Sequence, residues 1–292
     1  MFPRVPDQHK KDKRLVPNGL GAIYVLVSAV YLLLMFFFQT LNHQVNIESV
    51  LPPLILAVCI LFGGFLGLLD DWLDLKWRYK AFLPLIAAIP LASFAYLVPL
   101  RPSIGLPIIG TIDFGAYYYF IVVPVIVTII TNTVNQLGGL NGLETICPAV
   151  VLIGLMAISG PLAILLYVPL AVWLALAYFN FRGKIFVGNT GSFAIGTSLA
   201  AFAIISDLKA NLIVSVLPYI FNSSLILLTY FIFRTRASVA FDGEKLCSDH
   251  RRSLITIITY NRRLTERQVV VIISVLVGAS TGLALLFQRF WP

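Results

Sequence analysis

Long apolar runs constrain the fold of this chain more than any other feature of its sequence. About 20 apolar residues in a helix cross the hydrocarbon core of a bilayer, and the sequence holds about nine runs near that length. They span residues 19–39, 50–69, 81–100, 116–136, 142–159, 161–180, 191–206, 209–233 and 268–290. Membrane β-strands would instead alternate apolar and polar residues. The sequence therefore predicts an all-α, polytopic membrane bundle of about nine transmembrane helices, forming one domain over residues 1–292.

The composition excludes a water-soluble protein. Hydrophobic residues make up 59% of the chain and charged residues only 12%, whereas soluble domains carry about 25% charged residues. A disordered chain is excluded as well, because disorder requires low hydrophobicity. The three cysteines include no Cys-x-x-Cys pair, so we expect neither a disulfide framework nor a thiolate metal site. Residues 1–18 are polar and basic and precede a full-length apolar run, which predicts no cleavable signal peptide.

The charged residues predict the orientation in the membrane. The chain has 21 Lys and Arg against 13 Asp and Glu, a net charge of +8. In the nine-helix scheme all basic residues except Arg101, Lys209 and Arg289 lie on the side of the N-terminus. The positive-inside rule therefore predicts a cytoplasmic N-terminus and a C-terminus outside. The basic residues are spread over several short loops, which disfavours nucleic acid as a partner and leaves topology and anionic substrates as explanations.

An acidic pair ends the second apolar run. Asp70 and Asp71 are followed by a basic segment that reaches Lys80. The C-terminus of a helix disfavours negative charge, so two acids there indicate the handling of metal, phosphate or protons. A simple solvated helix end is the alternative.

Two amides and several glycines follow the fourth run. Asn132 and Asn135 lie three residues apart and share a helix face; their oxygens could ligate a hard cation. Gly138 and Gly139 would let the backbone approach a ligand closely. An ordinary Asn/Gly-rich turn with capping amides is the alternative.

A third segment, residues 186–192, is rich in glycine and hydroxyl groups and starts the seventh run. Such a helix start can bind phosphate through its free N–H groups, or it can simply carry an N-cap. Arg234 and Arg236 close the eighth run and could fork onto a diphosphate or merely end a membrane segment. Taken together, the four groups predict a site for a Mg²⁺-bound diphosphate on one membrane face.

In their order along the chain these motifs resemble those of the polyprenyl-phosphate N-acetylhexosamine-1-phosphate transferases. The resemblance extends over almost the whole chain, and its most specific motifs are the acidic pair with Lys80 and the string from Asn132 to Glu144. The bacterial branches carry a histidine cluster where this chain has only His250, and Asp-Gly where it has Asn141-Gly142. The chain therefore looks most similar to the eukaryotic and archaeal dolichyl-phosphate N-acetylglucosamine-1-phosphate transferases.

The resemblance implies a reaction and its setting. N-acetylglucosamine 1-phosphate would pass from UDP-GlcNAc to a polyprenyl or dolichyl phosphate with release of UMP, the first step of lipid-linked oligosaccharide assembly for glycosylation. The implied cofactor is Mg²⁺, with Mn²⁺ as a substitute. The implied setting is the bilayer of the archaeal plasma membrane or the endoplasmic reticulum, with the site facing the cytoplasm and the enzyme as a homodimer.

The resemblance also implies residue roles. Asp70 and Asp71 would be catalytic acids, acting on the lipid phosphate or organising the metal and Lys80, which would hold phosphate. Asn135 and Asn189 match metal ligands. The matches to substrate-binding positions are Asn18, Asn132, Gly139, Asn141, Glu144, Phe186, Arg234 and Arg236. Among them, Gly139 and Phe186 would sandwich the uracil and Asn141 would read its edge, while the arginines would contact the diphosphate and sugar.

Two departures from the family pattern stand out. Asn189 replaces a metal-ligating aspartate and lacks its charge, so we expect weaker Mg²⁺ affinity and a slow or inactive enzyme. The chain also begins where the family's first cytoplasmic loop would lie, so that the family's N-terminal helix is expected to be absent. The main alternative is therefore a catalytically impaired relative that binds nucleotide sugar or lipid phosphate without turnover. A transporter is disfavoured, because transporters place charged residues near mid-membrane.

Overall fold

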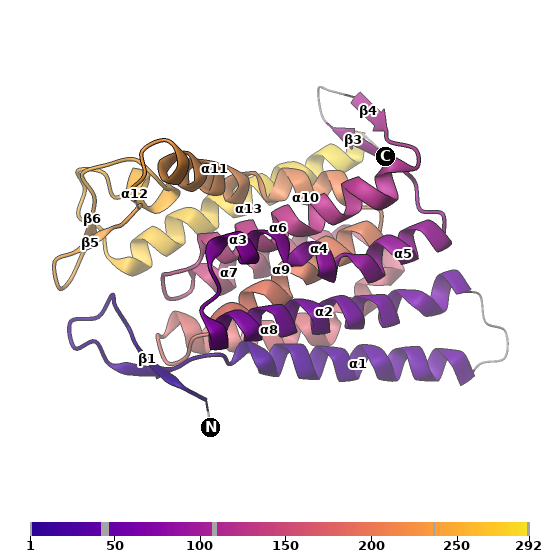
Figure 1. Ribbon diagram of the computed structural model, residues 1–292, viewed down its shortest axis with the longest axis horizontal. Coiled ribbons are helices and arrows are strands. Elements are labelled where there is room, and N and C mark those ends of the chain that lie inside the picture. Colours follow the sequence, from indigo (N-terminus) through magenta and orange to yellow (C-terminus); the bar gives the residue numbers. More distant parts are fainter. Residues whose placement is uncertain (1, 42–46, 107–109, 236, 291–292) are drawn as a thin grey trace.

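Helices form most of the protein, as its apolar sequence predicts. The computed structural model describes residues 2–41, 47–106, 110–235 and 237–290. The long helices are α1 (Gly21–Leu41), α2 (Ile47–Leu73), α6 (Val123–Leu137), α7 (Leu143–Ile158), α8 (Tyr167–Phe181), α9 (Gly188–Ile205), α11 (Leu217–Phe231) and α13 (Glu266–Phe290). The short ones are α3 (Trp77–Phe82), α4 (Pro84–Ala87), α5 (Ile89–Leu97), α10 (Lys209–Ser215) and α12 (Leu254–Ile258). Figure 1 shows that the long helices lie side by side in one bundle.

The apolar runs of the sequence coincide with helices. Within the described residues, seven helical segments are long and apolar enough to cross a bilayer, and an eighth is added if the bent pair α10 and α11 counts as one span. The remaining run corresponds to α7, which is apolar but has only 16 residues. The predicted all-α, polytopic membrane bundle is confirmed.

Prolines break two of the predicted runs, which the sequence analysis treated as continuous. In the third run Pro84 begins α4 and Pro90 lies in the first turn of α5. In the eighth run Pro218 lies in the first turn of α11, after a bend of 58° from α10. Proline has no N–H to donate and clashes with the preceding turn. As a result α3 is a short helix of its own at the start of the membrane-crossing segment Trp77–Leu97, shortly after α2 ends.

Helix α9 forms the centre of the bundle. Every residue from Thr190 to Ile205 is buried, and α9 lies between α2 and α6 in Figure 1. Glycines of α2 permit a close approach, since a Cβ atom at Gly67 would lie 2.1 Å from the carbonyl oxygen of Asn189. Small residues let helix backbones approach one another in membranes. The end of α2 consequently lies directly against the first turn of α9.

Three short antiparallel hairpins, which the apolar runs do not predict, connect the helices. The hairpin of β1 (Arg4–Pro6) and β2 (Leu15–Pro17) and that of β5 (Ala240–Phe241) and β6 (Leu246–Cys247) lie at the same end of the bundle. The hairpin of β3 (Ser103–Leu106) and β4 (Gly110–Asp113) lies at the opposite end. Figure 1 places the acidic end of α2 and the start of α9 toward the end with the first two hairpins.

The close approach of α2 and α9 leads to a testable expectation. In Gly67→Ala the added methyl group would clash with the backbone of Asn189 and Thr190, the nearest atom lying 2.1 Å away. We expect a loss of about 1–3 kcal/mol in stability, measured by thermal unfolding in detergent. Gly282→Ala in α13 is the matched control, because no atom lies within 4 Å of its added Cβ. Equal unfolding midpoints for the two variants would show that the helices do not approach this closely.

Candidate active site

Asp70, the first residue of the acidic pair, is a buried residue of the candidate site and is only 2% exposed. Its Oδ1 lies 2.8 Å from Nζ of Lys80 and accepts a hydrogen bond from the N–H of Leu75 at 3.1 Å. Its Oδ2 is buried and has no hydrogen-bond partner among the described residues. An unsatisfied buried carboxylate oxygen is costly. Asp70 therefore presents an oxygen suited to a proton, a cation or a donor group of a ligand.

Asn132 fixes the short helix that carries Lys80. Its Nδ2 donates to the carbonyl oxygen of Ala81 at 3.2 Å and to that of Thr128 at 2.9 Å. The bond to Ala81 joins α3 to α6 one residue after Lys80, and the bond to Thr128 lies within α6. Asn132 therefore positions the Lys80–Asp70 ion pair, a role that the prediction of substrate binding did not include.

Asp71, which is exposed, binds the first turn of α9. Its Oδ1 accepts the N–H of Asn189 at 2.9 Å, and its Oδ2 accepts the N–H of Thr190 at 2.9 Å and the hydroxyl of Thr190 at 2.7 Å. The first N–H groups of a helix have no partner within the helix, and they attract negative charge. The sequence predicted that the N–H groups at this helix start could bind a phosphate. In the structure two of them donate to Asp71 instead. The close contact of α2 and α9 at Gly67 makes this possible.

The two predicted metal ligands lie on neighbouring helix ends. Asn135 Oδ1 accepts a hydrogen bond from the hydroxyl of Ser192 at 2.7 Å, and the same hydroxyl lies 3.3 Å from the carbonyl oxygen of Asn189. The described residues contain no group of three or more His, Cys, Asp or Glu that could hold a metal ion. Mg²⁺ does not need such a group, because it uses one or two carboxylates together with waters and substrate phosphates. The open Oδ2 of Asp70 and the amide oxygens fit that chemistry.

The chain before α1 forms one wall of the site. The N–H of Phe186 donates to the carbonyl of Pro17 at 2.8 Å, and the N–H of Leu20 donates to the carbonyl of Phe186 at 3.1 Å. A Cβ atom at Gly188, whose φ is +70°, would lie 2.8 Å from Asp71 Oδ2 and 3.1 Å from Asn18 Oδ1. The residues before α1, including Asn18, therefore lie against the segment that carries Phe186 and Asn189.

A buried polar cluster holds Asn141. Its Nδ2 donates to Asp7 Oδ2 and to Glu266 Oε1, both at 2.9 Å, and its N–H donates to the same Glu266 oxygen at 2.7 Å. Lys10 forms an ion pair with Glu266. The Oδ1 of Asn141 is buried and has no partner among the described residues. Asn141, predicted to read a uracil edge, therefore has its amide nitrogen engaged and its carbonyl oxygen open.

A second buried amide holds Glu144. Asn180, at the end of α8, is fully buried. Its Nδ2 donates to Glu144 Oε1 at 3.1 Å, and its Oδ1 accepts the N–H of Gly142 at 2.8 Å. Gly139, in the same loop, has a φ of +108° and open space where a side chain would be. The glycine-rich loop therefore has a fixed inner edge and an open outer face, as a ligand-binding loop requires.

Asp7, Glu266 and Asn180 are site residues that sequence reasoning missed. Asp7 lies in a polar N-terminal stretch that carries no motif. Glu266 lies in the Leu-Thr-Glu-Arg string at the start of the last helix, which fits the family pattern but predicted no role for the acid. Asn180 was included in an apolar run. For Asn180 the sequence signal was a polar amide at the end of that apolar run.

A groove leads from Lys80 between α3, α6 and α11. Its volume is about 560 Å³. Lys80 is the charged residue of its lining, and apolar side chains such as Ile129, Leu227 and Phe231 line much of it. The other polar lining residues are Thr128, Asn132, Thr133, Asn135, Gln136, Ser223 and Ser224. A groove with many apolar side chains and one cation in its lining suits a long apolar ligand with a charged head.

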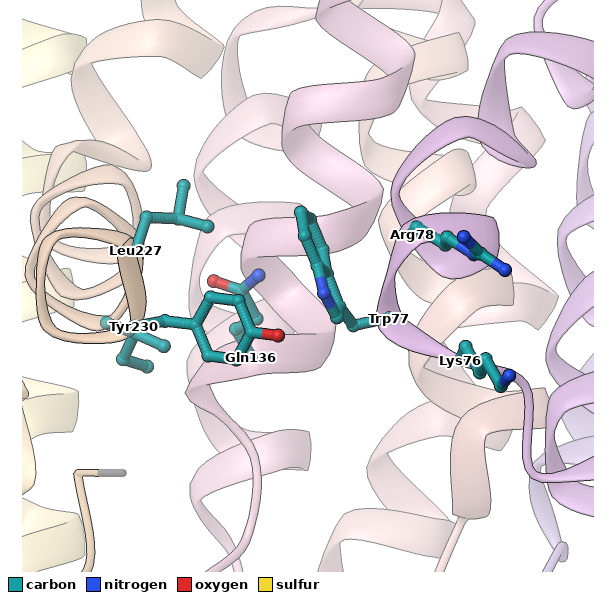
Figure 2. Close-up of a pocket in the computed structure, with 7 residues that line it drawn as sticks. Lys76, Trp77, Arg78, Gln136, Leu227 and Tyr230 are labelled. Atoms are coloured by element: carbon teal, nitrogen blue, oxygen red, sulfur yellow. The ribbon is translucent and has the colours of Figure 1, made fainter. Parts of the chain in front are cut away.

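A second hollow of about 690 Å³ shares Trp77, Gln136 and Leu227 with the groove. Figure 2 shows Trp77 between α3 and α11, directed toward Leu227 and Tyr230. The ring of Trp77 packs edge-on against Tyr230 with ring centres 5.5 Å apart. Trp77 therefore forms the wall common to both hollows.

The predicted arginine pair is not joined to these residues. Arg234 follows α11 and is exposed, with a φ of +50°. It makes no hydrogen bond or ion pair with the described part of the site. Arg236 lies outside the described residues. The role of both in contacting a diphosphate stays a prediction.

Comparison with known proteins adds independent findings. The sequence profile of glycosyl transferase family 4 matches residues 53–207. A protein of Saccharolobus solfataricus, provisionally named a UDP-N-acetylglucosamine–dolichyl-phosphate N-acetylglucosaminephosphotransferase, is 31% identical over 277 residues, which are 91% of this chain and 82% of that protein.

Two further relatives are more distant. The UDP-N-acetylglucosamine–dolichyl-phosphate N-acetylglucosaminephosphotransferase of Schizosaccharomyces pombe is 29% identical over 75% of this chain, and the match spans 59% of that protein. A phospho-N-acetylmuramoyl-pentapeptide-transferase of Streptococcus pyogenes is 26% identical over 79% of this chain and 71% of its own length.

Proposed function

We propose that this chain, which belongs to glycosyl transferase family 4, transfers N-acetylglucosamine 1-phosphate from UDP-N-acetylglucosamine to a polyprenyl phosphate of the dolichyl type. The names of the archaeal and yeast relatives support this reaction and these substrates. The proposal rests on Lys80, which is paired with Asp70 and lines a groove with many apolar side chains. A lipid phosphate requires both an apolar channel and a cation at its end.

The proposed reaction joins two anions. An oxygen of the lipid phosphate attacks the β-phosphorus of the UDP-sugar, the bond from that phosphorus to the bridging oxygen breaks, and UMP leaves with that oxygen. Catalysis of such a transfer depends on positioning and on charge stabilisation. Lys80, held by Asp70, supplies a fixed positive charge for the lipid phosphate. The open Oδ2 of Asp70 can accept a proton from a protonated lipid phosphate.

The nucleotide end of the site is proposed to lie over the glycine-rich loop and the segment before α9. Phe186 and Gly139 are proposed to border this region, and the buried, unpaired carbonyl oxygen of Asn141 is proposed to accept an N–H group of a base. Asn18 lies beside Asp71 in the same wall.

The proposed metal site combines Asn135 and Asn189 with the carboxylates of Asp70 and Asp71. Bound Mg²⁺ would neutralise charge on the diphosphate and on the leaving UMP. The excess of basic residues on the predicted cytoplasmic face supports the proposal that the substrates meet on that side of the membrane.

The variant Asn189→Asp tests the metal assignment. A carboxylate at this position adds a unit charge beside Asp71, so we expect half-maximal activity at a roughly tenfold lower Mg²⁺ concentration. Without Mg²⁺ the two acids repel each other, and we therefore expect Mg²⁺ to raise the unfolding temperature of the variant more than that of the wild type. Asn189→Ala serves as the control and should weaken both responses. If Asn189→Asp gains neither activity nor Mg²⁺-dependent stability, residue 189 does not ligate the metal.

The proposed reaction is tested by following two labels in UDP-N-acetylglucosamine, one in the sugar and one in the phosphate attached to it. Transfer of the sugar 1-phosphate carries both labels into the lipid fraction in equal amounts. Transfer of the sugar alone would carry only the first label and is a different reaction. Retention of the nucleotide sugar by the protein with neither label in the lipid would instead support the impaired relative, to which Asn189 points.

A further inference from the structure

A pair of adjoining hollows lies apart from the proposed active site, beside the start of α13. One has a volume of about 620 Å³ and the other about 330 Å³, and both are lined by Leu264 and Ile272. We call the two together the arginine pocket; its polar lining consists of Arg251, Tyr260, Arg262, Arg267 and Gln268. None of its residues lines the groove between α3, α6 and α11.

The arginine pocket holds positive charge that the protein does not neutralise. Within the described residues, Arg251, Arg262 and Arg267 take part in no ion pair. The guanidinium of Arg251 lies 4.1 Å from the ring centre of Tyr260, and that of Arg267 lies 5.6 Å from the ring centre of Phe181. These contacts orient the two arginines without compensating their charge.

Nearby carboxylates have other partners or lie free at the surface. Asp242 is paired with Arg263 at 3.8 Å, and the N–H groups of Lys245 and Glu244 hold the pKa of Asp242 below its usual range. Glu266 is buried and bound to Lys10 and Asn141. The exposed carboxylates of Glu244 and Asp249 form no ion pair with described residues.

The apolar wall of the pocket continues along a membrane helix. Val271 and Ile272 line the pocket and are 52% and 43% exposed. Val275 and Leu276, one turn further along α13, are exposed as well. Residues 266–288 form one of the segments long and apolar enough to cross a bilayer. The arginines therefore lie where this segment leaves the membrane. The exposed apolar face of α13 begins next to them and continues along the helix.

We propose that the arginine pocket binds the head group of an anionic phospholipid, whose acyl chains lie along the exposed face of α13. The planar guanidinium group of arginine can donate two hydrogen bonds to the oxygens of one phosphate group. Basic pockets at a membrane boundary recognise anionic lipids. The bound lipid also stabilises the segment that delivers Glu266, the neighbour of Arg267, to Asn141.

The test uses the purified full-length chain in detergent and counts bound lipids by native mass spectrometry, with phosphatidylglycerol and phosphatidylcholine as probes. The double variant R251Q/R262Q removes two charges from the pocket. R263Q is the matched control, because Arg263 lies on the same segment but does not line the pocket. At about 1 kcal/mol per arginine near a lipid surface, we expect R251Q/R262Q to bind phosphatidylglycerol roughly 30-fold more weakly. R263Q should bind it as the wild type does.

A second measurement needs no variant, so that a folding defect cannot decide the result. Binding of phosphatidylglycerol to the wild type should weaken as salt rises, and millimolar glycerol phosphate should not replace the lipid. Equal retention of the two lipids, salt-independent binding, or equal behaviour of R251Q/R262Q and R263Q would overturn the proposal. Conversion of a dimer to a monomer in R251Q/R262Q would overturn it as well, and would assign the pocket to a second copy of the chain.

Discussion

Asp70→Asn is expected to reduce the rate of transfer by about 10²- to 10⁴-fold, the range typical of a lost acid–base group. The carboxylate orients Lys80 through the 2.8 Å ion pair and offers the open Oδ2. The amide loses the charge that holds Lys80 and cannot accept a proton. The rate of UMP release at saturating concentrations of both substrates measures the effect.

Asp74→Asn is the control for this prediction. Asp74 lies four residues from Asp70 and is exposed. Its φ of +45° is a conformation that asparagine tolerates well. We expect its activity to stay within a few-fold of the wild type. If Asp70→Asn and Asp74→Asn have similar rates, Asp70 does not act in the transfer.

Asp71 is expected to show two separable effects. Asp71→Ala removes three hydrogen bonds to the first turn of α9 and should cost about 0.5–2 kcal/mol of stability, as the loss of a helix cap does. Asp71→Asn keeps one oxygen acceptor, which can retain the two bonds from Thr190, whereas its amide nitrogen cannot accept the N–H of Asn189. We therefore expect Asp71→Asn to unfold between Asp71→Ala and the wild type and yet to lose about 10²-fold or more in activity, because the negative charge proposed to help hold Mg²⁺ at the diphosphate is lost.

Comparison of the two Asp71 variants separates a structural role from a chemical one. Thermal unfolding reports the cap, and UMP release reports the reaction. If Asp71→Asn recovers both the stability and the activity that Asp71→Ala loses, Asp71 is only a cap for α9. Loss of activity in a stable Asp71→Asn protein supports its assignment to the reaction.

The sequence alone was sufficient to predict the helices and to predict that several residues of the candidate site lie together. Apolar runs identify helices because residues facing lipid and core are both apolar. The ion pair of Asp70 and Lys80 follows from their closeness in sequence, on either side of a short turn. The prolines at 84, 90 and 218 also indicate where the helices of these runs are interrupted, because proline cannot donate a backbone hydrogen bond within a helix.

Contacts between distant segments could not be predicted in this way. The binding of Asp71 to the start of α9 depends on the approach of two helices at Gly67. The bond from Asn141 to Glu266 joins residues 125 positions apart, and it is formed only when the loop after α6 meets the start of α13. Asn132 shows the same limit, because its motif gives no sign of the bond to Ala81 that joins α3 to α6.

We propose that UDP-N-acetylglucosamine and a polyprenyl phosphate react at one Mg²⁺-dependent site around Asp70 and Lys80. Its most direct test is UMP release by the purified chain with UDP-N-acetylglucosamine and dolichyl phosphate. We expect UMP formation that requires both substrates and Mg²⁺, and that falls to background in Asp70→Asn. Release of UDP instead of UMP, or UMP formation that persists without the lipid phosphate, would contradict it.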